Sequence, residues 1–137
     1  MDKTTLVGTD RIGLIGVNIE DGERLLRALD EANLDIYAAL WFYLSESDLW
    51  RFIVASPLVD KEGPREVYAL IQSELSKLTP PLSEISLKNI SVMGLEDDLI
   101  KILRVGIPRH ERPGGFWFVR NVIDNVFIEA AYIYRIR

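Results

Sequence analysis

Apolar side chains recur every three or four residues near the start of the chain, and this spacing predicts the first helix. Leu25, Leu26 and Leu29 fall on one face at helical intervals. Asn18 stands where it can cap the helix, and the acidic residues that follow it favour the positive end of the helix dipole. We therefore expect a helix that begins after Asn18 and ends near Asn33.

A narrower apolar stripe predicts a second helix in the middle of the chain. Its members are Val67, Ile71, Leu75 and Leu78. Pro64 suits the first turn of this helix, because its missing N–H needs no partner there. A third, short helix is favoured over residues 96–105 by the acids before it and by the Gly and Pro after it, although the same apolar residues also fit a strand.

Runs of aromatic and β-branched residues predict the strands. Residues 36–44 and 50–56 flank a polar turn, which indicates a β-hairpin. Residues 116–119 and 126–136, joined by 120–125, indicate a second hairpin, and residues 85–92 a further strand. Because hairpins dominate, we expect an α+β fold with a mostly antiparallel sheet of about five strands and two to three helices on one face, in the order α-β-β-α-β-α-β-β.

The first and last of these strands are apolar on both sides, whereas a strand in a sheet covered on one face alternates apolar with polar residues. Their aromatic side chains with polar tips are Tyr37, Trp41, Tyr43, Tyr132 and Tyr134. Two interpretations follow. Helices of the same molecule cover both faces of the sheet, or these rings form a binding surface for a protein partner or a second copy, because Tyr and Trp are enriched in interfaces.

Glycines interrupt the apolar segment at residues 6–17, which predicts a loop or a short irregular strand. Glycine loops before helices can bind phosphate through backbone N–H groups. The spacing of Gly8, Gly13 and Gly16 fits neither the dinucleotide-binding motif nor the P-loop, and Leu14 stands where the P-loop lysine would be. We therefore expect ordinary glycine turns.

Composition narrows the class of protein. The 137 residues fit one domain spanning 1–137, with 48% hydrophobic residues and a net charge of −5. The absence of Cys excludes a disulfide framework and fits a cytoplasmic protein. No apolar run is long enough to span a membrane, since about 20 residues are needed, and the first residues do not form a secretory signal.

Positive charge concentrates in the last third of the chain, although the chain as a whole is acidic. The candidate residues for an anion site there are Arg104, Arg109, His110, Arg112, Trp117 and Arg120. Arginine forks beside aromatic rings and flexible glycines are typical of phosphate and single-stranded nucleic-acid sites. The alternative is a solvated loop whose arginines pair with Glu111, Asp124 and the acids of the first half.

Candidate chemistry is sparse. His110 is the single histidine, and no serine or cysteine nucleophile can be paired with it from the sequence. Glu96, Asp97 and Asp98 together with Asp124 or Glu129 would offer oxygen ligands to Mg²⁺, but acids at a helix start are explained by the helix dipole. We predict no catalytic residue, no metal site and no cofactor.

Four segments carry a resemblance that covers most of the chain. They are 38–41 (AALW), 50–57 (WRFIVASP), 63–65 (GPR) and 129–135 (EAAYIYR). In these segments the chain resembles a set of small uncharacterised bacterial α+β proteins. No activity is attached to that set, so the resemblance assigns no functional residue.

The sequence thus predicts a non-enzymatic binding or assembly module that acts through an aromatic-rich sheet face, as a homo-oligomer or with a protein partner. The alternative is binding of nucleic acid or a phosphate ligand through the Arg-rich loop at 104–120. A small enzyme that uses His110 is the third hypothesis.

Overall fold

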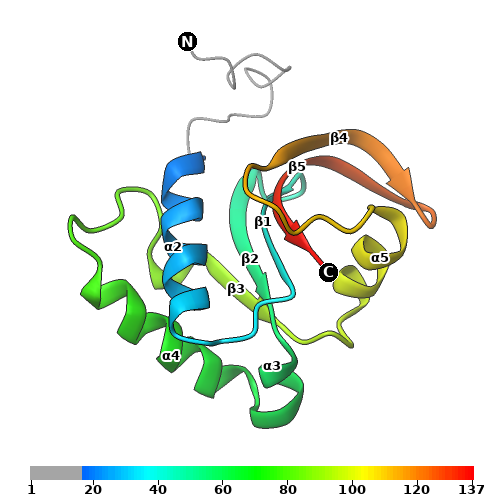
Figure 1. The fold of residues 1–137 in the computed structure, drawn as a ribbon. Coiled ribbons are helices and arrows are strands. Elements are labelled where there is room, and N and C mark those ends of the chain that lie inside the picture. The colour runs from blue at the N-terminus through cyan, green and yellow to red at the C-terminus, as the bar shows by residue number, and fades with distance from the viewer. Residues whose placement is uncertain (1–16) are drawn as a thin grey trace.

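A five-stranded sheet organises the part of the chain that the computed structural model describes, residues 17–137 (Figure 1). Its strands are β1 (Ala38–Leu44), β2 (Leu49–Ala55), β3 (Ile90–Met93), β4 (Phe116–Ile123) and β5 (Val126–Ile136), in the spatial order β3-β2-β1-β5-β4. Only β2 and β3 pair in parallel. The predicted α+β class and mostly antiparallel sheet are confirmed, and the strand predicted at 85–92 is limited to its last part.

Helices surround this sheet. They are α2 (Ile19–Glu31), α3 (Pro57–Glu62), α4 (Pro64–Lys77), α5 (Asp98–Gly106) and a 3₁₀ turn at Leu87–Asn89. The Asn18 side chain caps α2 by accepting a hydrogen bond from the Asp21 N–H at 3.0 Å. Asp97 caps α5, so the ambiguous segment at 96–105 is helical. Gly63, at φ +90°, separates α3 from α4. The helix predicted around Pro64 is α4, and α3 is an additional short helix before it.

The prediction that all helices lie on one face is wrong. Leu25 of α2 and Ile71 of α4 pack with Trp41 on one face of the sheet, whereas Ile100 of α5 packs with Leu40 on the other. Neighbouring strand residues point to opposite faces, so Leu40 and Trp41 mark the two sides. A strand that is apolar on both sides requires cover on both sides, and α5 supplies the second cover.

The β4–β5 hairpin is longer than predicted and bends over α5 (Figure 1). Its turn contains only Asp124 and Asn125, at φ 51° and 68°. Positive φ at both positions is what a two-residue hairpin turn requires. Arg120, at φ 45°, interrupts the pairing of β4 with β5. Farther along β4, Ile123 packs so closely on Gly106 of α5 that a Cβ at position 106 would overlap the Ile123 side chain.

The glycine turns predicted at residues 6–17 fall almost wholly on residues 1–16, which lie outside the described part of the chain. Within residues 17–137, none of the helices has both the length and the apolar character needed to cross a membrane.

Candidate functional site

The aromatic face predicted to await a partner is mostly covered within the molecule. Trp41 is 0% exposed, Tyr134 5%, and Tyr43 and Tyr132 9% each. The start of α2 covers it: Trp41 Nε1 donates to the Asn18 carbonyl at 3.3 Å, and the Tyr134 hydroxyl donates to the Ile19 carbonyl at 2.7 Å. The polar tips of Trp41 and Tyr134 therefore bind a helix end, and the Tyr43 hydroxyl donates to Asp48 in the β1–β2 turn.

Tyr37, the fifth residue of that set, has a different environment. It is half-buried, and the guanidinium carbons of Arg104 and Arg137 lie 5.5 and 5.4 Å from its ring centroid. Such cation–π contacts hold two arginines at the end of the sheet. Tyr37 thus belongs to the basic region and not to the aromatic cluster.

The aromatic rings form a continuous row across four strands. In order of contact they are Trp41, Phe52, Tyr134, Tyr132, Trp117, Trp50 and Tyr43, with neighbouring centroids 5.0–6.2 Å apart. Trp117, predicted for the anion site, is therefore part of this row. Its Nε1 is buried and has no hydrogen-bond partner among residues 17–137.

The row reaches the edge of the sheet at β4. Within residues 17–137 this strand pairs only with β5, so its outer backbone groups face no other strand. Phe116, Trp117, Phe118 and Val119 are each half-buried. Phe116 and Phe118 contact the α5 side of the sheet, and Trp117 the α2 side, so the edge is apolar on both faces.

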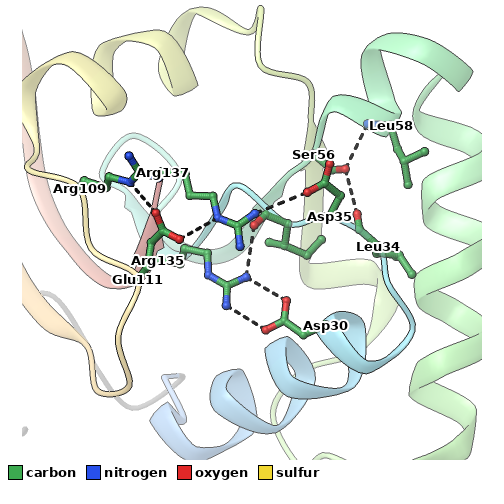
Figure 2. A network of polar contacts seen from close by, with 10 residues as sticks. Asp30, Leu34, Asp35, Ser56, Leu58, Arg109, Glu111, Arg135 and Arg137 are labelled. Atoms are coloured by element: carbon green, nitrogen blue, oxygen red, sulfur yellow. Dashed lines mark hydrogen bonds and ion pairs between the residues drawn. The ribbon is translucent and has the colours of Figure 1, made fainter.

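Most arginines near the C-terminal end of the sheet are bound to acids or carbonyls (Figure 2). Arg109 Nε and Arg137 Nε donate to the two oxygens of Glu111, the second at 3.1 Å. Arg137 also lies 3.5 Å from Asp35. These contacts, the Arg109 hydrogen bond first, hold the pKa of Glu111 below its usual range.

Arg135 forms a bidentate ion pair in this region. It donates two hydrogen bonds to Asp30 and one to the Ile36 carbonyl (Figure 2). The bond to Asp30 raises the pKa of Arg135, which keeps the guanidinium charged although it is largely buried. The sequence did not single out Asp30 as the partner of Arg135, or Asp35 as the partner of Arg137. In each pair the two residues are about a hundred positions apart.

His110 anchors a loop. Its backbone N–H and C=O pair with Ile136 at 2.8 and 2.9 Å, in line with β4, and the chain then leaves the sheet at 111–115 before re-entering at Phe116. Its Nε2 lies 2.6 Å from the Gly114 carbonyl and closes the loop. Because a carbonyl oxygen only accepts, this hydrogen bond requires the tautomer or charge state that has its proton on Nε2.

The predicted anion residues do not converge into one site. Arg109, His110 and Arg112 line a shallow hollow with Pro113 and Phe116, whereas Trp117 and Arg120 are not among its lining residues. Arg104 donates to the Arg137 carbonyl at 2.7 Å instead. Arg112 and Arg120 are exposed, and the structure gives neither an ion-pair partner within residues 17–137.

The acids weighed for Mg²⁺ have structural roles. Asp97 caps α5, and Glu96 lies 3.6 Å from Lys101. In the described part of the chain, no group of His, Asp or Glu is arranged to hold a metal ion.

A second cleft, not anticipated from the sequence, lies between α2 and the loop at 111–115. Its volume is about 320 Å³, and its lining includes Arg27, Asp30, Glu111, Arg112 and Arg135. Sequence reasoning missed it because α2 and this loop meet only in the fold.

Comparison with known proteins adds no identity: no family model matches the chain, and neither a curated protein nor a solved structure matches it significantly. The resemblance to small bacterial proteins therefore stays a prediction.

Proposed function

We propose that this protein is a non-enzymatic assembly module, and that two copies pair through the free edge of β4. The supporting observation is that residues 116–119 are apolar on both faces yet only half-buried at a sheet edge. Edge strands of this kind pair readily with another chain unless charge or a bulge prevents it. In such a dimer, the part of the aromatic sheet face that contacts the second copy is its end at the β4 edge. The buried rings in the middle of that face make no contact with the second copy.

The composition of β4 favours a second copy as the occupant. If two β4 strands pair antiparallel around Phe118, residues 117–119 supply the paired backbone, and each Arg120, just beyond it, lies near Phe116 of the other copy. A guanidinium beside an aromatic ring is attractive, whereas pairing centred on Arg120 would oppose two like charges. A two-fold interface of this type uses the same patch on both molecules.

The same strand limits the strength of the association. Arg120 adopts φ 45°, which interrupts regular pairing after Val119. Only a short stretch is therefore available, and small interfaces are typical of weak complexes. We expect a reversible dimer at micromolar concentration in the cytoplasm, where the absence of Cys is unremarkable.

Nucleic-acid binding through the loop at 104–120 is the weaker candidate. Arg104 and Arg109 already donate to Arg137 and Glu111, and the chain is acidic overall. An acidic protein gains little from the attraction that dominates backbone binding.

Sedimentation velocity over a range of concentrations tests the dimer. We expect Val119→Lys to leave a monomer, because a lysine on the edge opposes strand addition. Val105→Lys is the matched control, since Val105 is 83% exposed on α5. If the wild type stays monomeric at high concentration, or if both variants weaken association equally, the proposal is wrong.

Val119 is half-buried, so Val119→Lys could also unfold the protein. Amide hydrogen exchange of the wild type avoids this problem. We expect slower exchange in residues 116–119 as concentration rises, and unchanged exchange in the exposed part of α5. Exchange that does not depend on concentration, at concentrations where a dimer sediments, would exclude β4 as the interface.

A further inference from the structure

The cleft between α2 and the loop at 111–115 has two walls of different origin. Leu26 and Arg27 belong to α2, Arg112 and Pro113 belong to the loop, and Tyr134 from β5 lies between them. A volume of about 320 Å³ is at the lower end of what small-molecule pockets occupy. The cleft is therefore large enough for a small ligand.

Most acids of the cleft already have cationic partners. Asp30 receives two hydrogen bonds from Arg135, at 2.9 and 2.8 Å, and Glu111 receives hydrogen bonds from two arginines. These pairs leave little negative charge available to the cleft. Figure 2 shows them together, with Glu111 on the loop and Asp30 on α2.

Arg27 and Arg112 are left as the uncommitted cations. Both are exposed, both line the cleft, and neither has an ion-pair or hydrogen-bond partner among residues 17–137. They stand on opposite walls. A guanidinium without a partner can donate charge-assisted hydrogen bonds to an oxyanion. Two guanidinium groups together offer enough N–H donors to bind several oxygens of one ligand.

The wall that carries Arg112 is held in place. His110 Nε2 closes the loop on the Gly114 carbonyl at 2.6 Å, and the backbone of His110 is paired with Ile136. Gly114 adopts φ +89°, a conformation that glycine reaches without strain. Because the loop is tied at its base, less ordering entropy is lost when a ligand binds.

We propose that this cleft binds a small oxyanion ligand, a phosphate monoester or a carboxylate, between the guanidinium groups of Arg27 and Arg112. The non-polar part of the ligand lies against Leu26 and Pro113. Glu23 also lines the cleft, one helical turn before Arg27, and its negative charge weakens the binding of any anion there by repulsion. This site is independent of the β4 edge and of any dimer.

Amide chemical-shift titration at low salt tests the site, with inorganic phosphate and acetate as separate probes. We expect shifts confined to residues 23–30 and 111–115 with one or both probes. The probe that binds more tightly identifies phosphate or carboxylate as the ligand group. Shifts spread over the whole surface, or absent with both probes, would overturn the proposal.

Arginine variants separate the site from general charge. Arg27→Gln and Arg112→Gln should each raise the dissociation constant about tenfold, because each removes charge-assisted hydrogen bonds. Arg65→Gln is the matched control, since Arg65 is exposed on α4 and does not line the cleft. An equal effect of all three variants would contradict the proposal.

Two further measurements distinguish a binding role from a structural one. Glu23→Gln should tighten phosphate binding, a gain that loss of structure cannot produce. A single-stranded oligonucleotide should not displace phosphate. Tight oligonucleotide binding that falls steeply with salt would show instead that these arginines bind a nucleic-acid backbone.

Discussion

Arg135 and Asp30 join β5 to α2 through two parallel hydrogen bonds, Nη1–Oδ1 at 2.9 Å and Nη2–Oδ2 at 2.8 Å. The two residues are 105 positions apart in the sequence. The arginine is the more buried partner, with 12% of its side chain exposed against 40% for the aspartate. The pair therefore fixes the helix on the sheet at the floor of the cleft.

We expect Asp30→Asn to lower the free energy of unfolding by about 1–3 kcal/mol, because it leaves the largely buried Arg135 without its anion. Asp35→Asn is the control. Asp35 is 3.5 Å from Arg137 and more than half exposed, so the expected loss is below about 0.5 kcal/mol. Urea unfolding at neutral pH measures both, and equal losses would show that the bidentate geometry contributes nothing.

Ile71 and Leu70 are neighbours on α4 with opposite environments. Ile71 is 0% exposed in the core, whereas Leu70 is 43% exposed. Ile71→Ala should cost about 2–5 kcal/mol through the lost burial and the cavity that remains. Leu70→Ala should cost less than about 1 kcal/mol. The comparison by urea unfolding tests the packing of α4, and a loss below about 0.5 kcal/mol for Ile71→Ala would contradict it.

Burial raises the pKa of Tyr134 far above the ordinary tyrosine value. In the unfolded chain this phenol ionises near pH 10. A pKa raised by folding means that stability is complete below about pH 10 and declines as pH rises further, because only the unfolded state releases the proton. We expect alkaline unfolding to coincide with the ionisation of Tyr134.

Ultraviolet absorbance of tyrosinate provides the readout. Tyr134→Phe should reduce the absorbance change that accompanies unfolding and leave the change before unfolding as it is. Its stability at neutral pH should fall by about 1 kcal/mol through the lost hydrogen bond to the Ile19 carbonyl. If the variant instead loses absorbance before unfolding begins, Tyr134 is accessible and the burial argument fails.

Local signals in the sequence were sufficient for most of the elements. The cap at Asn18, Pro64 at a helix start and the polar turns gave correct helices and hairpins, because these features act within a few residues. They did not give the short helix α3, and they left 96–105 open between helix and strand. The first strand was also predicted correctly to be apolar on both sides, and Leu40 and Trp41 lie in the core on opposite faces of it. The length of the second hairpin turn was predicted wrongly: the sequence indicated a connection at 120–125, whereas the pairing of β4 continues to Ile123.

Long-range relations could not be predicted. The side chains of β5 do not alternate regularly between the two faces of the sheet. Ala39 pairs with Arg135 and Leu40 with Ile133, so Tyr134 has no opposite residue on β1. This irregularity turns Ile136 to the same face as Ile133. The acids that bind the C-terminal arginines, and the helix carbonyls that accept from Trp41 and Tyr134, are set by the same tertiary arrangement.

The position of β5 has a consequence for biosynthesis. It follows β4 in the sequence, yet it lies between β1 and β4 in the sheet (Figure 1). While the ribosome still holds residues 126–136, β1 lacks one neighbour and β4 has none. The nascent chain therefore exposes its aromatic strands until translation passes this point, and folding then requires contacts across most of the sequence, which slows it. Chaperone capture during synthesis is therefore expected while this inner strand is still missing from the sheet.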